Sequence, residues 1–364
     1  MNRARSAVTR RHVLQAGAAA FAAGVPMPAI GQGPRPVKFT TSWVPEGPNL
    51  FAYVARDRGF WKERGLDVSV ARGSGSGTAI QTTAAGTFDF GMGATPTVII
   101  QASKGLGVSC IGQINYDALM GVGVLANSPI KSPKEIEGKT LGASVTSGEY
   151  PFLSLYAERA GFDFAKVKLV QIDAKVRERS LLEKQVDAVS AFATSTIPTL
   201  ASKGTDVRFF KFSAVGLDFY GQSLITQPAR VKADAALCAA FVDGAMAAIK
   251  FSMTNPDEAL DLFLKANDEV RMNADGTAYV KIGLGLTHAT NLVSEVKDHG
   301  FGYADPAKVQ GMADTIVKYG AGADAKPVDA AALFTNDFAG KQKLSAAEEK
   351  AVADWAKPYT KYLG

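Results

Sequence analysis

The sequence is poor in the residues on which metal centres and nucleophilic catalysis depend. It has only two cysteines, Cys110 and Cys238, which lie far apart and outside any metal-ligand spacing. Of its three histidines, His288 and His299 fall in the C-terminal part, and neither belongs to an H-E-x-x-H motif. A packing or surface role suits both histidines better than catalysis. The apolar surroundings of the two cysteines are compatible with buried thiols or with a disulfide.

Motifs for nucleotide binding are missing as well. The glycine-rich run "GSGSG" at residues 73–77 has neither the G-x-G-x-x-G spacing of dinucleotide sites nor the G-K-[ST] of phosphate loops. No G-x-S-x-G element occurs either. After residue 32 there is no uninterrupted apolar run of ~18 residues, the length that a membrane-spanning helix needs. We therefore expect a globular protein without a metal or another cofactor.

The first 31 residues differ in composition from the rest. Arg10 and Arg11 precede a short apolar run, which is followed by proline and small residues. This order is typical of a removed export signal, and "TRRHVL" resembles a twin-arginine signal, with an ordinary Sec signal as the alternative. We expect cleavage near Gln32 and a mature protein in the periplasm.

The formal net charge of +5 belongs to this leader. Residues 1–31 hold four arginines and no acidic residue, so the remaining chain carries a formal net charge of +1. A nucleic-acid-binding protein needs a basic face on its mature fold. We therefore expect no nucleic-acid partner.

The order of expected strands and helices predicts an α/β protein of two lobes. Strand-like and helical runs alternate over residues 36–126, and a second α/β unit follows over residues 127–224. Residues 225–364 are mostly helical and have no sheet of their own to cover. If these helices pack on the first sheet, lobe I consists of residues 36–126 and 225–364, and lobe II consists of residues 127–224. Each lobe is expected to hold a mostly parallel sheet, and two crossings would make a hinged clamshell.

Four loops at the carboxyl ends of expected strands share one composition. They are rich in Gly, Ser or Thr, and each opens a helix whose first N–H groups are unpaired and favour acceptor groups. In open α/β sheets such loops surround the ligand site. Each loop alone is explained as well by N-caps and turns, but four on one rim favour binding. The loops supply most predicted binding residues: Asn49, Ser74, Ser76, Gly93, Ala94, Thr95, Thr146, Ser147 and Gly148.

Aromatic residues complete the predicted site. Trp43 stands in the turn "SWVPEGPN", where two prolines stiffen the backbone, and an exposed indole at such a place indicates a binding role. Phe192 and Tyr220 fall at a strand end and in the expected hinge, and a core position is the alternative for each. We predict that all three contact the ligand.

Five segments, in this order, resemble a known family. The group comprises periplasmic substrate-binding proteins of ABC importers related to the thiamine-pyrimidine synthases, with members for sulfonates, taurine and nitrate. The resemblance implies a two-lobed α/β clamshell of type II that binds its ligand without chemistry. The segments are "W-x-P-x-x-x-N…A-x-x-x-G-F-W-K-E-R-G-L-D-V" (43–68), "AAGTFDFGMG" (84–93), "SPKEIEGKTLG" (132–142), "LLEKQVDAV" (181–189) and "NPDEALDLFL" (255–264).

The resemblance also carries over single residues. Trp43 matches the family's stacking aromatic, and Asn49 stands where pyrimidine-precursor binders commonly carry histidine. Thr95, Ser147 and Phe192 match loop and strand-end positions of the family's site. The run "FATST" lacks the carboxylate that pyrimidine binders place after this strand, and the synthases' cysteine-rich iron motif is absent. The missing carboxylate, together with Asn49, counts against a pyrimidine ligand, and the missing cysteine motif counts against synthase chemistry.

Residues and resemblance together predict an exported, monomeric solute-binding protein that is not an enzyme. It would capture a small polar or aromatic molecule of the sulfonate, carboxylate or nitrogen-heterocycle class and deliver it to an ABC permease in the inner membrane. The alternative is an exported enzyme acting on a related molecule. For that chemistry the chain offers only Glu149, Arg177 and Lys175 as acid–base candidates.

Overall fold

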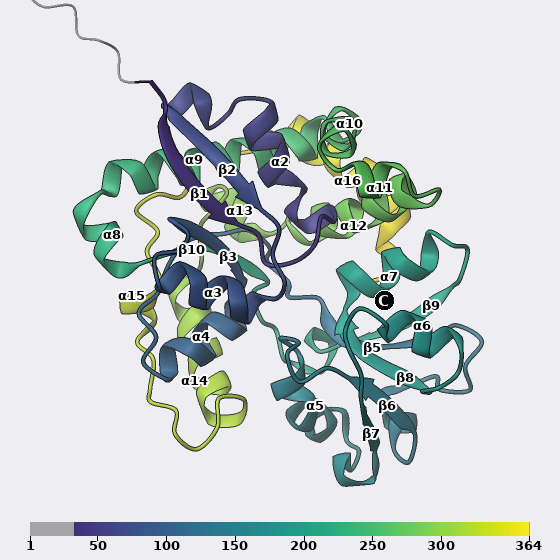
Figure 1. Cartoon of the computed structure of the whole chain (residues 1–364). Helices are drawn as coiled ribbons and strands as arrows, with labels where there is room; N and C mark the ends of the chain where they lie inside the picture. The colour runs from purple at the N-terminus through teal and green to yellow at the C-terminus, as the bar shows by residue number, and fades with distance from the viewer. Residues whose placement is uncertain (1–32, 364) are drawn as a thin grey trace, which may run out of the picture. The chain divides into compact units, whose positions relative to one another are not determined.

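Two five-stranded sheets organise residues 33–363, the part of the chain that the computed structural model describes. The predicted export signal, residues 1–31, lies outside the described residues. Contacts divide the chain after Arg35, and the unit that begins at Pro36 holds both sheets. We call each sheet, with the helices packed on it, a lobe (Figure 1).

The first sheet has the strand order β2-β1-β3-β10-β4. β3 runs parallel to β1, whereas β10 is antiparallel to both of its neighbours, β3 and β4. One strand therefore runs against the others, and that strand returns to this sheet from the second lobe. The strands are β1 (Arg35–Thr40), β2 (Leu66–Ala71), β3 (Phe90–Ala94), β4 (Ser109–Gln113) and β10 (Gln222–Thr226).

The second sheet repeats this plan with the order β7-β6-β8-β5-β9. β6 is parallel to β7 and β8, while β5 is antiparallel to β8 and β9. The predicted two-lobed α/β clamshell is confirmed, with one antiparallel strand in each sheet. The strands are β5 (Met120–Leu125), β6 (Thr140–Ala143), β7 (Lys168–Gln171), β8 (Ala188–Phe192) and β9 (Val207–Lys211).

The sequence placed residues 120–125 in lobe I, but β5 pairs within the second sheet. Likewise β10 lies in the first sheet, although residues 222–224 were assigned to lobe II. Alternating apolar residues indicate a strand without indicating its sheet, because pairing depends on distant partners. We propose that the lobe boundaries lie in the two crossing segments, 114–119 and 212–221.

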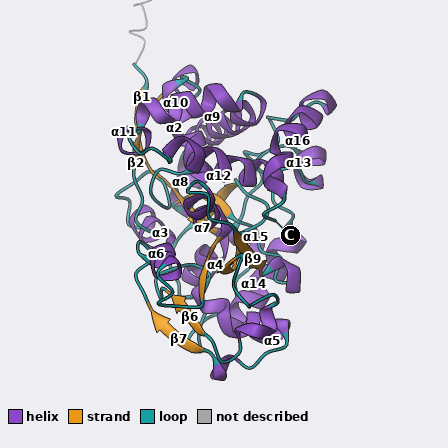
Figure 2. Ribbon diagram, turned by 90° about the vertical axis from the view of Figure 1, so that its right-hand side faces the viewer, coloured by secondary structure: helices purple, strands orange, loops and turns teal. Residues whose placement is uncertain are grey.

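The helices cover both sheets, as Figure 2 shows in purple around the orange strands. α2, α9 and α10 pack together over the first sheet, and α14 packs on α4. The longer helices are α2 (Leu50–Asp57), α3 (Ser76–Ala84), α4 (Thr95–Ser103), α5 (Leu153–Ala160), α7 (Ala193–Ala201), α9 (Ala235–Thr254), α10 (Pro256–Ala266), α12 (Gly276–Thr290), α14 (Pro306–Tyr319) and α16 (Ala346–Thr360). The shorter ones are α6 (Arg177–Leu182), α8 (Pro228–Ala233), α11 (Asp268–Arg271), α13 (Ser294–His299) and α15 (Ala330–Leu333).

The C-terminal helices pack on more than the first sheet. α12 also contacts α7 of the second lobe. Leu286 on α12 is buried in one apolar cluster with Ile197 on α7 and Phe209 on β9. The C-terminal helical segment therefore joins the two lobes beside the pocket.

Local sequence explains where the first elements begin and end. In β1, Val37 and Phe39 are buried while Lys38 between them is exposed, which is the alternation of a half-buried strand. In α2, Leu50 and Val54 are spaced by one helical turn and both are buried. Gly59, at φ +88°, provides the left-handed residue after that helix.

The core of the first lobe is an aromatic stack. The rings of Phe90 and Phe241 lie 4.0 Å apart and nearly parallel, and Trp61 also stacks on Phe241, with 5.2 Å between the ring centres. The indole N–H of Trp61 donates to the carbonyl of Phe241 over 2.9 Å. Trp61 is therefore a core residue with its polar group satisfied. Cys110 is a buried thiol outside any disulfide.

α9 is the one helix in residues 33–363 whose length and composition match a membrane span. Most of it is buried inside the first lobe. Phe241, which belongs to the aromatic stack, lies on this helix. Its apolar character thus matches that of a core helix.

The two crossing segments are bonded to each other. Gly221 N–H donates to the carbonyl of Asn115 over 2.8 Å, and Ala118 N–H donates to the carbonyl of Phe219 over 2.8 Å. A Cβ at position 221 would lie 2.8 Å from Asn115 Cβ and 2.9 Å from the carbonyl oxygen of Asp117. Only glycine permits this close approach.

Each crossing segment is also anchored to a helix start. Gly221 O accepts the N–H of Thr95, the first residue of α4, at 2.7 Å. Leu119 O accepts the N–H of Ala193, the first residue of α7, at 2.7 Å. Each lobe therefore has one such hydrogen bond between a crossing segment and the start of a helix.

Candidate functional site

A pocket lies between the two lobes and is lined by residues of both. Its wall comes from the loop after β1, the start of α3, the crossing segments, the loops after β6 and before α6, the start of α7 and the end of α12. Its volume is about 90 Å³, several times the space that one water molecule needs. Of the predicted binding residues, seven line it: Trp43, Ser74, Ser76, Thr146, Ser147, Gly148 and Phe192.

The loop after β1 is held in shape by Asn49. The carboxamide oxygen of Asn49 accepts the N–H of Glu46 at 3.0 Å, and its Nδ2 donates to the carbonyl of Val44 at 2.7 Å. Asn49 is completely buried and does not line the pocket. Its observed contacts are those of a residue that fixes the turn carrying Trp43 and Glu46.

Trp43 is half-buried on the pocket wall. None of the ring–ring contacts within residues 33–363 involves its indole, in contrast to Trp61 in the core. The carbonyl of Trp43 accepts the Thr41 hydroxyl at 2.8 Å, which ties the backbone of the turn. A fixed indole with no aromatic neighbour can stack on a planar ligand.

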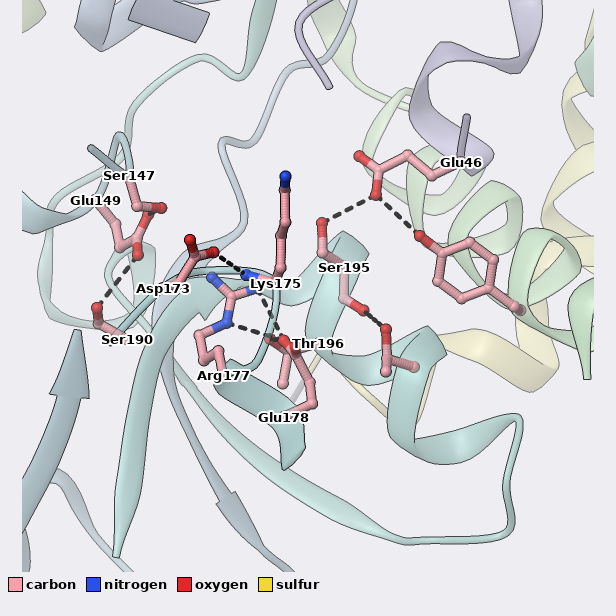
Figure 3. A network of polar contacts seen from close by, with 12 residues as sticks. Glu46, Ser147, Glu149, Asp173, Lys175, Arg177, Glu178, Ser190, Ser195 and Thr196 are labelled. Carbon is pink, nitrogen blue, oxygen red and sulfur yellow. Dashed lines mark hydrogen bonds and ion pairs between the residues drawn. The ribbon is translucent and has the colours of Figure 1, made fainter. Parts of the chain in front are cut away.

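Glu46 brings a buried carboxyl to the same wall. Its side chain is 6% exposed, and Oε2 accepts hydrogen bonds from Ser195 Oγ at 3.0 Å and Tyr279 Oη at 3.2 Å (Figure 3). Burial raises the pKa of Glu46 to about 7, although the two hydroxyl donors and the positive charge of Arg177 lower it. This carboxyl changes protonation near neutral pH.

Arg177, at the start of α6, faces the pocket from the second lobe. The residue is 5% exposed, and Nε and Nη2 bind Glu178 Oε1 at 2.9 and 2.8 Å. Burial would lower the pKa of Arg177, but attraction to Glu178, Glu149 and Glu46 raises it. The guanidinium therefore stays charged inside the protein.

Glu149 lies behind the wall, completely buried. Ser147 Oγ donates to its Oε2, and Ser190 Oγ donates to its Oε1 at 3.2 Å (Figure 3). With both oxygens bonded, Glu149 does not line the pocket, and Lys175 is exposed. Of the three acid–base candidates, only Arg177 reaches the pocket wall.

The lobes approach one another at Gly148. A Cβ there would lie 3.1 Å from Thr97 Oγ1 on α4 and 3.2 Å from Phe192 Cζ at the end of β8. Thr97 belongs to the first lobe and Phe192 to the second. The loop after β6 therefore closes one side of the pocket by contact with both lobes.

Three predicted residues, Gly93, Ala94 and Thr95, lie behind the pocket wall rather than on it. Gly93 and Ala94 are buried within β3. The hydroxyl of Thr95 lies 2.7 Å from Ser223 Oγ, and its N–H is taken by Gly221. The helix start at Thr95 is used inside the fold, so its N–H is not offered to a ligand.

Tyr220 is also outside the pocket wall. It is completely buried and packs edge-on against Tyr116, with ring centres 5.7 Å apart. Its hydroxyl donates to Glu295 Oε1 at 3.1 Å and accepts the N–H of Asp305 at 3.1 Å. Tyr220 therefore has the surroundings of a core residue, which was the alternative to a ligand contact.

Several wall residues were not predicted. Glu46 was inside the turn "SWVPEGPN", and a carboxyl between two prolines next to a tryptophan was a usable signal. α12 follows the expected hinge by more than fifty residues, and no local pattern indicates that its end reaches the pocket. The unpredicted wall residues include Ser42, Glu46, Asn115, Asp117, Ser195, Gln222, Thr287 and Thr290.

His288 and His299 have the packing and surface surroundings that the sequence favoured. His288 is buried against Trp355, at 5.2 Å between ring centres, and burial lowers its pKa to about 3. His299 stacks on Tyr303 at 4.0 Å. Neither histidine lines the pocket.

Comparison with known proteins identifies the family. The sequence model of the family described as "NMT1/THI5 like" matches residues 49–259. The formylaminopyrimidine-binding protein of Halalkalibacterium halodurans is 30% identical over 64% of this chain and 71% of its own length. A more distant relative, the 4-amino-5-hydroxymethyl-2-methylpyrimidine phosphate synthase of Legionella pneumophila, is 22% identical over 60% of this chain and 69% of its own.

Solved structures share the fold. The periplasmic aliphatic sulphonate binding protein SsuA of Escherichia coli superposes with a TM-score of 0.65, covering 86% of this chain and 95% of its own at 14% identity. At 14% identity, this structural similarity is evidence for the fold alone. The family resemblance inferred from the sequence is confirmed by the matched family model.

Proposed function

The chain belongs to the NMT1/THI5-like family, and on that premise we propose that it is the solute-binding protein of an ABC importer. It is exported by its first 31 residues, works in the periplasm as a monomer, and binds without catalysing a reaction. It closes two lobes on a small organic molecule and delivers it to a membrane permease. The observation that carries the proposal is the pocket between the lobes, with the indole of Trp43 on its wall.

Trp43 serves as the stacking surface for the ligand. Its ring has no aromatic neighbour among the described residues, and Asn49 and the prolines fix the turn that holds it. Stacking of a planar ligand adds ~0.5–1.5 kcal/mol beyond the burial of its area. Phe192, half-buried on the wall of the second lobe, offers a further apolar contact.

Closure is supported by the joints between the lobes. The crossing segments are bonded to each other and to the starts of α4 and α7. A ligand that contacts both lobes stabilises the closed arrangement by its differential affinity for the two states. The closed form is what the permease would recognise.

A thermal-shift screen tests this proposal. Protein lacking residues 1–31 is heated with sulfonates, aromatic acids, pyrimidines and ureides. A ligand at 100 times its dissociation constant adds about 2.7 kcal/mol to the free energy of unfolding. The shift should become clearly smaller in Trp43→Ala and stay nearly unchanged in Trp43→Phe. An undiminished shift in Trp43→Ala would place the ligand elsewhere.

An exported enzyme is the second candidate, favoured by the named synthase among the relatives. The geometry gives it little support, because Glu149 is bonded on both oxygens behind the wall and Lys175 is exposed. Incubation of the protein with a bound ligand distinguishes the two functions. Stoichiometric binding with no product excludes the enzyme, and turnover excludes a pure binding protein.

A further inference from the structure

The carboxyl of Glu46 is fixed on the first lobe. Its side chain accepts the backbone N–H of Asn49 within the same turn, and Oε2 accepts Tyr279 Oη of α12 at 3.2 Å. The turn itself lies directly on α12, because a Cβ at Gly47 would overlap backbone atoms of Gly283. The carboxyl therefore stays with the first lobe when the second lobe moves.

The second lobe completes the surroundings of this carboxyl. Ser195 Oγ on α7 donates to Oε2 of Glu46 at 3.0 Å (Figure 3). Arg177 and Glu178, both buried at the start of α6, are the charged residues that act on it. Glu46 is thus a titratable group of one lobe whose environment depends on contact with the other.

Arg177 and Glu178 supply no free counter-charge for Glu46. Nε and Nη2 of Arg177 bind Glu178 Oε1 at 2.9 and 2.8 Å. Attraction to Arg177 lowers the pKa of Glu46, whereas repulsion from Glu178 raises it. Glu46 forms no ion pair with any of residues 33–363. When ionised in the closed arrangement, it is therefore a buried charge without a salt bridge, which is costly.

Parting of the lobes would relieve this cost. Burial is the largest of the causes that together set the pKa of Glu46 at about 7, against an ordinary value of 4.5. In an open cleft, water reaches the carboxyl and replaces the hydroxyl of Ser195, while the dry surroundings are lost. The pKa then falls towards its ordinary value. The closed arrangement consequently holds a proton that the open one releases.

We propose that Glu46 is a pH-sensitive switch of lobe closure, which favours the closed arrangement when protonated and the open one when ionised. The support for closure is then complete below about pH 4.5 and is lost as the pH rises through about 7. This rests on the proposed function, because closure is the step that encloses the ligand, and it adds a regulation of that step.

The test measures the distance between the lobes in ligand-free protein lacking residues 1–31. Spin labels are attached to Gln81→Cys on α3 and Glu158→Cys on α5, which are exposed positions of the two lobes. The native cysteines are buried and stay unlabelled. Double electron–electron resonance gives the ratio of closed to open molecules. Between pH 5 and pH 8 this ratio should fall by roughly 10- to 70-fold.

Glu46→Gln should remain closed at both pH values. Its amide is neutral, as the protonated carboxyl is, and has nearly the same shape. The amide oxygen can accept the N–H of Asn49, and the amide nitrogen can donate to Ser195 and Tyr279, because a hydroxyl accepts as well as donates. Glu63→Gln, at a side chain that is 66% exposed, is the matched control and should respond as the wild type does.

Tyr279→Phe separates the titration of Glu46 from a merely structural effect. The hydroxyl of Tyr279 lowers the pKa of Glu46, so its removal should move the midpoint of the response to higher pH. An unmoved midpoint would show that another group titrates. The inference is also overturned by equal distances in the wild type at both pH values, by opening at low pH, or by a response that survives in Glu46→Gln.

The outcome is independent of the test of the proposed function, because no ligand is present. If the lobes do not respond to pH while a compound binds in a Trp43-dependent manner, the switch is wrong and the binding function stands. If the lobes respond to pH and no compound binds, the binding function fails and the switch stands.

Discussion

Ser195 Oγ donates a hydrogen bond of 3.0 Å to Glu46 Oε2, and the two residues belong to different lobes. Ser195 lies on α7, which follows β8 of the second sheet, and Glu46 lies in the turn after β1 of the first. The bond therefore joins the two lobes at the pocket wall. It links the position of a pocket carboxyl to the closure of the lobes.

Ser195→Ala should open the ligand-free protein. Removing the hydroxyl takes away one bond between the lobes, worth roughly 1 kcal/mol, while Glu46 keeps its bond from Tyr279. We expect a larger radius of gyration in small-angle X-ray scattering. Ser202→Ala, at the other end of α7, should leave the scattering unchanged. A Ser195→Ala protein as compact as the wild type would show that this bond does not hold the lobes.

Trp43→Ala should weaken ligand binding by roughly 10- to 100-fold, because it removes both the buried area and the stacking surface. Trp43→Phe keeps an aromatic ring, so its affinity for the ligand should fall only a few-fold. Calorimetric titration with a hit from the thermal-shift screen measures both. Equal affinities for the wild type and Trp43→Ala would remove Trp43 from the site.

Glu46 should make stability depend on pH in a defined direction. Its pKa is about 7 in the folded protein against 4.5 in the reference state, so the folded protein binds the extra proton between these values. Stability from this group is therefore full below about pH 4.5 and is lost as the pH rises through 7. Relative to Glu46→Gln, the wild type should lose roughly 3 kcal/mol between pH 4 and pH 8.

Urea denaturation of the two ligand-free proteins at both pH values measures this difference. All other titrating groups are the same in the two proteins, so their contributions to the pH dependence of stability cancel in the difference. A difference that does not change with pH, or that changes in the opposite direction, contradicts a buried Glu46 with a raised pKa.

Gly221→Ala should destabilise the crossing segments. The added methyl group would lie 2.8 Å from Asn115 Cβ and 2.9 Å from the carbonyl oxygen of Asp117. We expect a loss of roughly 2 kcal/mol in the free energy of unfolding. Gly311→Ala is the matched control, since nothing lies within 4 Å of its new methyl group in α14. It should be stabilising by roughly 0.5–1 kcal/mol. The same effect in both variants would contradict the tight joint.

The predictable part of the site follows from strand geometry. Loops at the carboxyl ends of parallel strands meet at one edge of a sheet, so Trp43, Ser74 and Ser147 were expected on the same rim. All three line the pocket. The fold and the family followed from the alternation of strands and helices and from motifs in a fixed order.

The features that could not be predicted depend on contacts between residues far apart in the sequence, which a local sequence pattern does not indicate. Glu46 is bonded by Tyr279, which lies 233 positions further along the chain. Thr95 stands at a helix start, but its N–H is taken by Gly221, in the crossing segment that returns from the other lobe. The sheet that β5 joins is likewise decided by β8 and β9 rather than by its own residues.

The paired crossing segments have a mechanical consequence. Because Gly221 bonds Asn115 while Phe219 bonds Ala118, the two segments bend together as one ribbon, and sliding of one past the other would break both bonds. We therefore expect the lobes to move relative to one another by rotation about a single axis along this ribbon. A pair of fluorescent labels, one on each lobe, would then report the whole motion as one distance. Such a ribbon makes the chain a natural scaffold for an optical sensor of its own ligand.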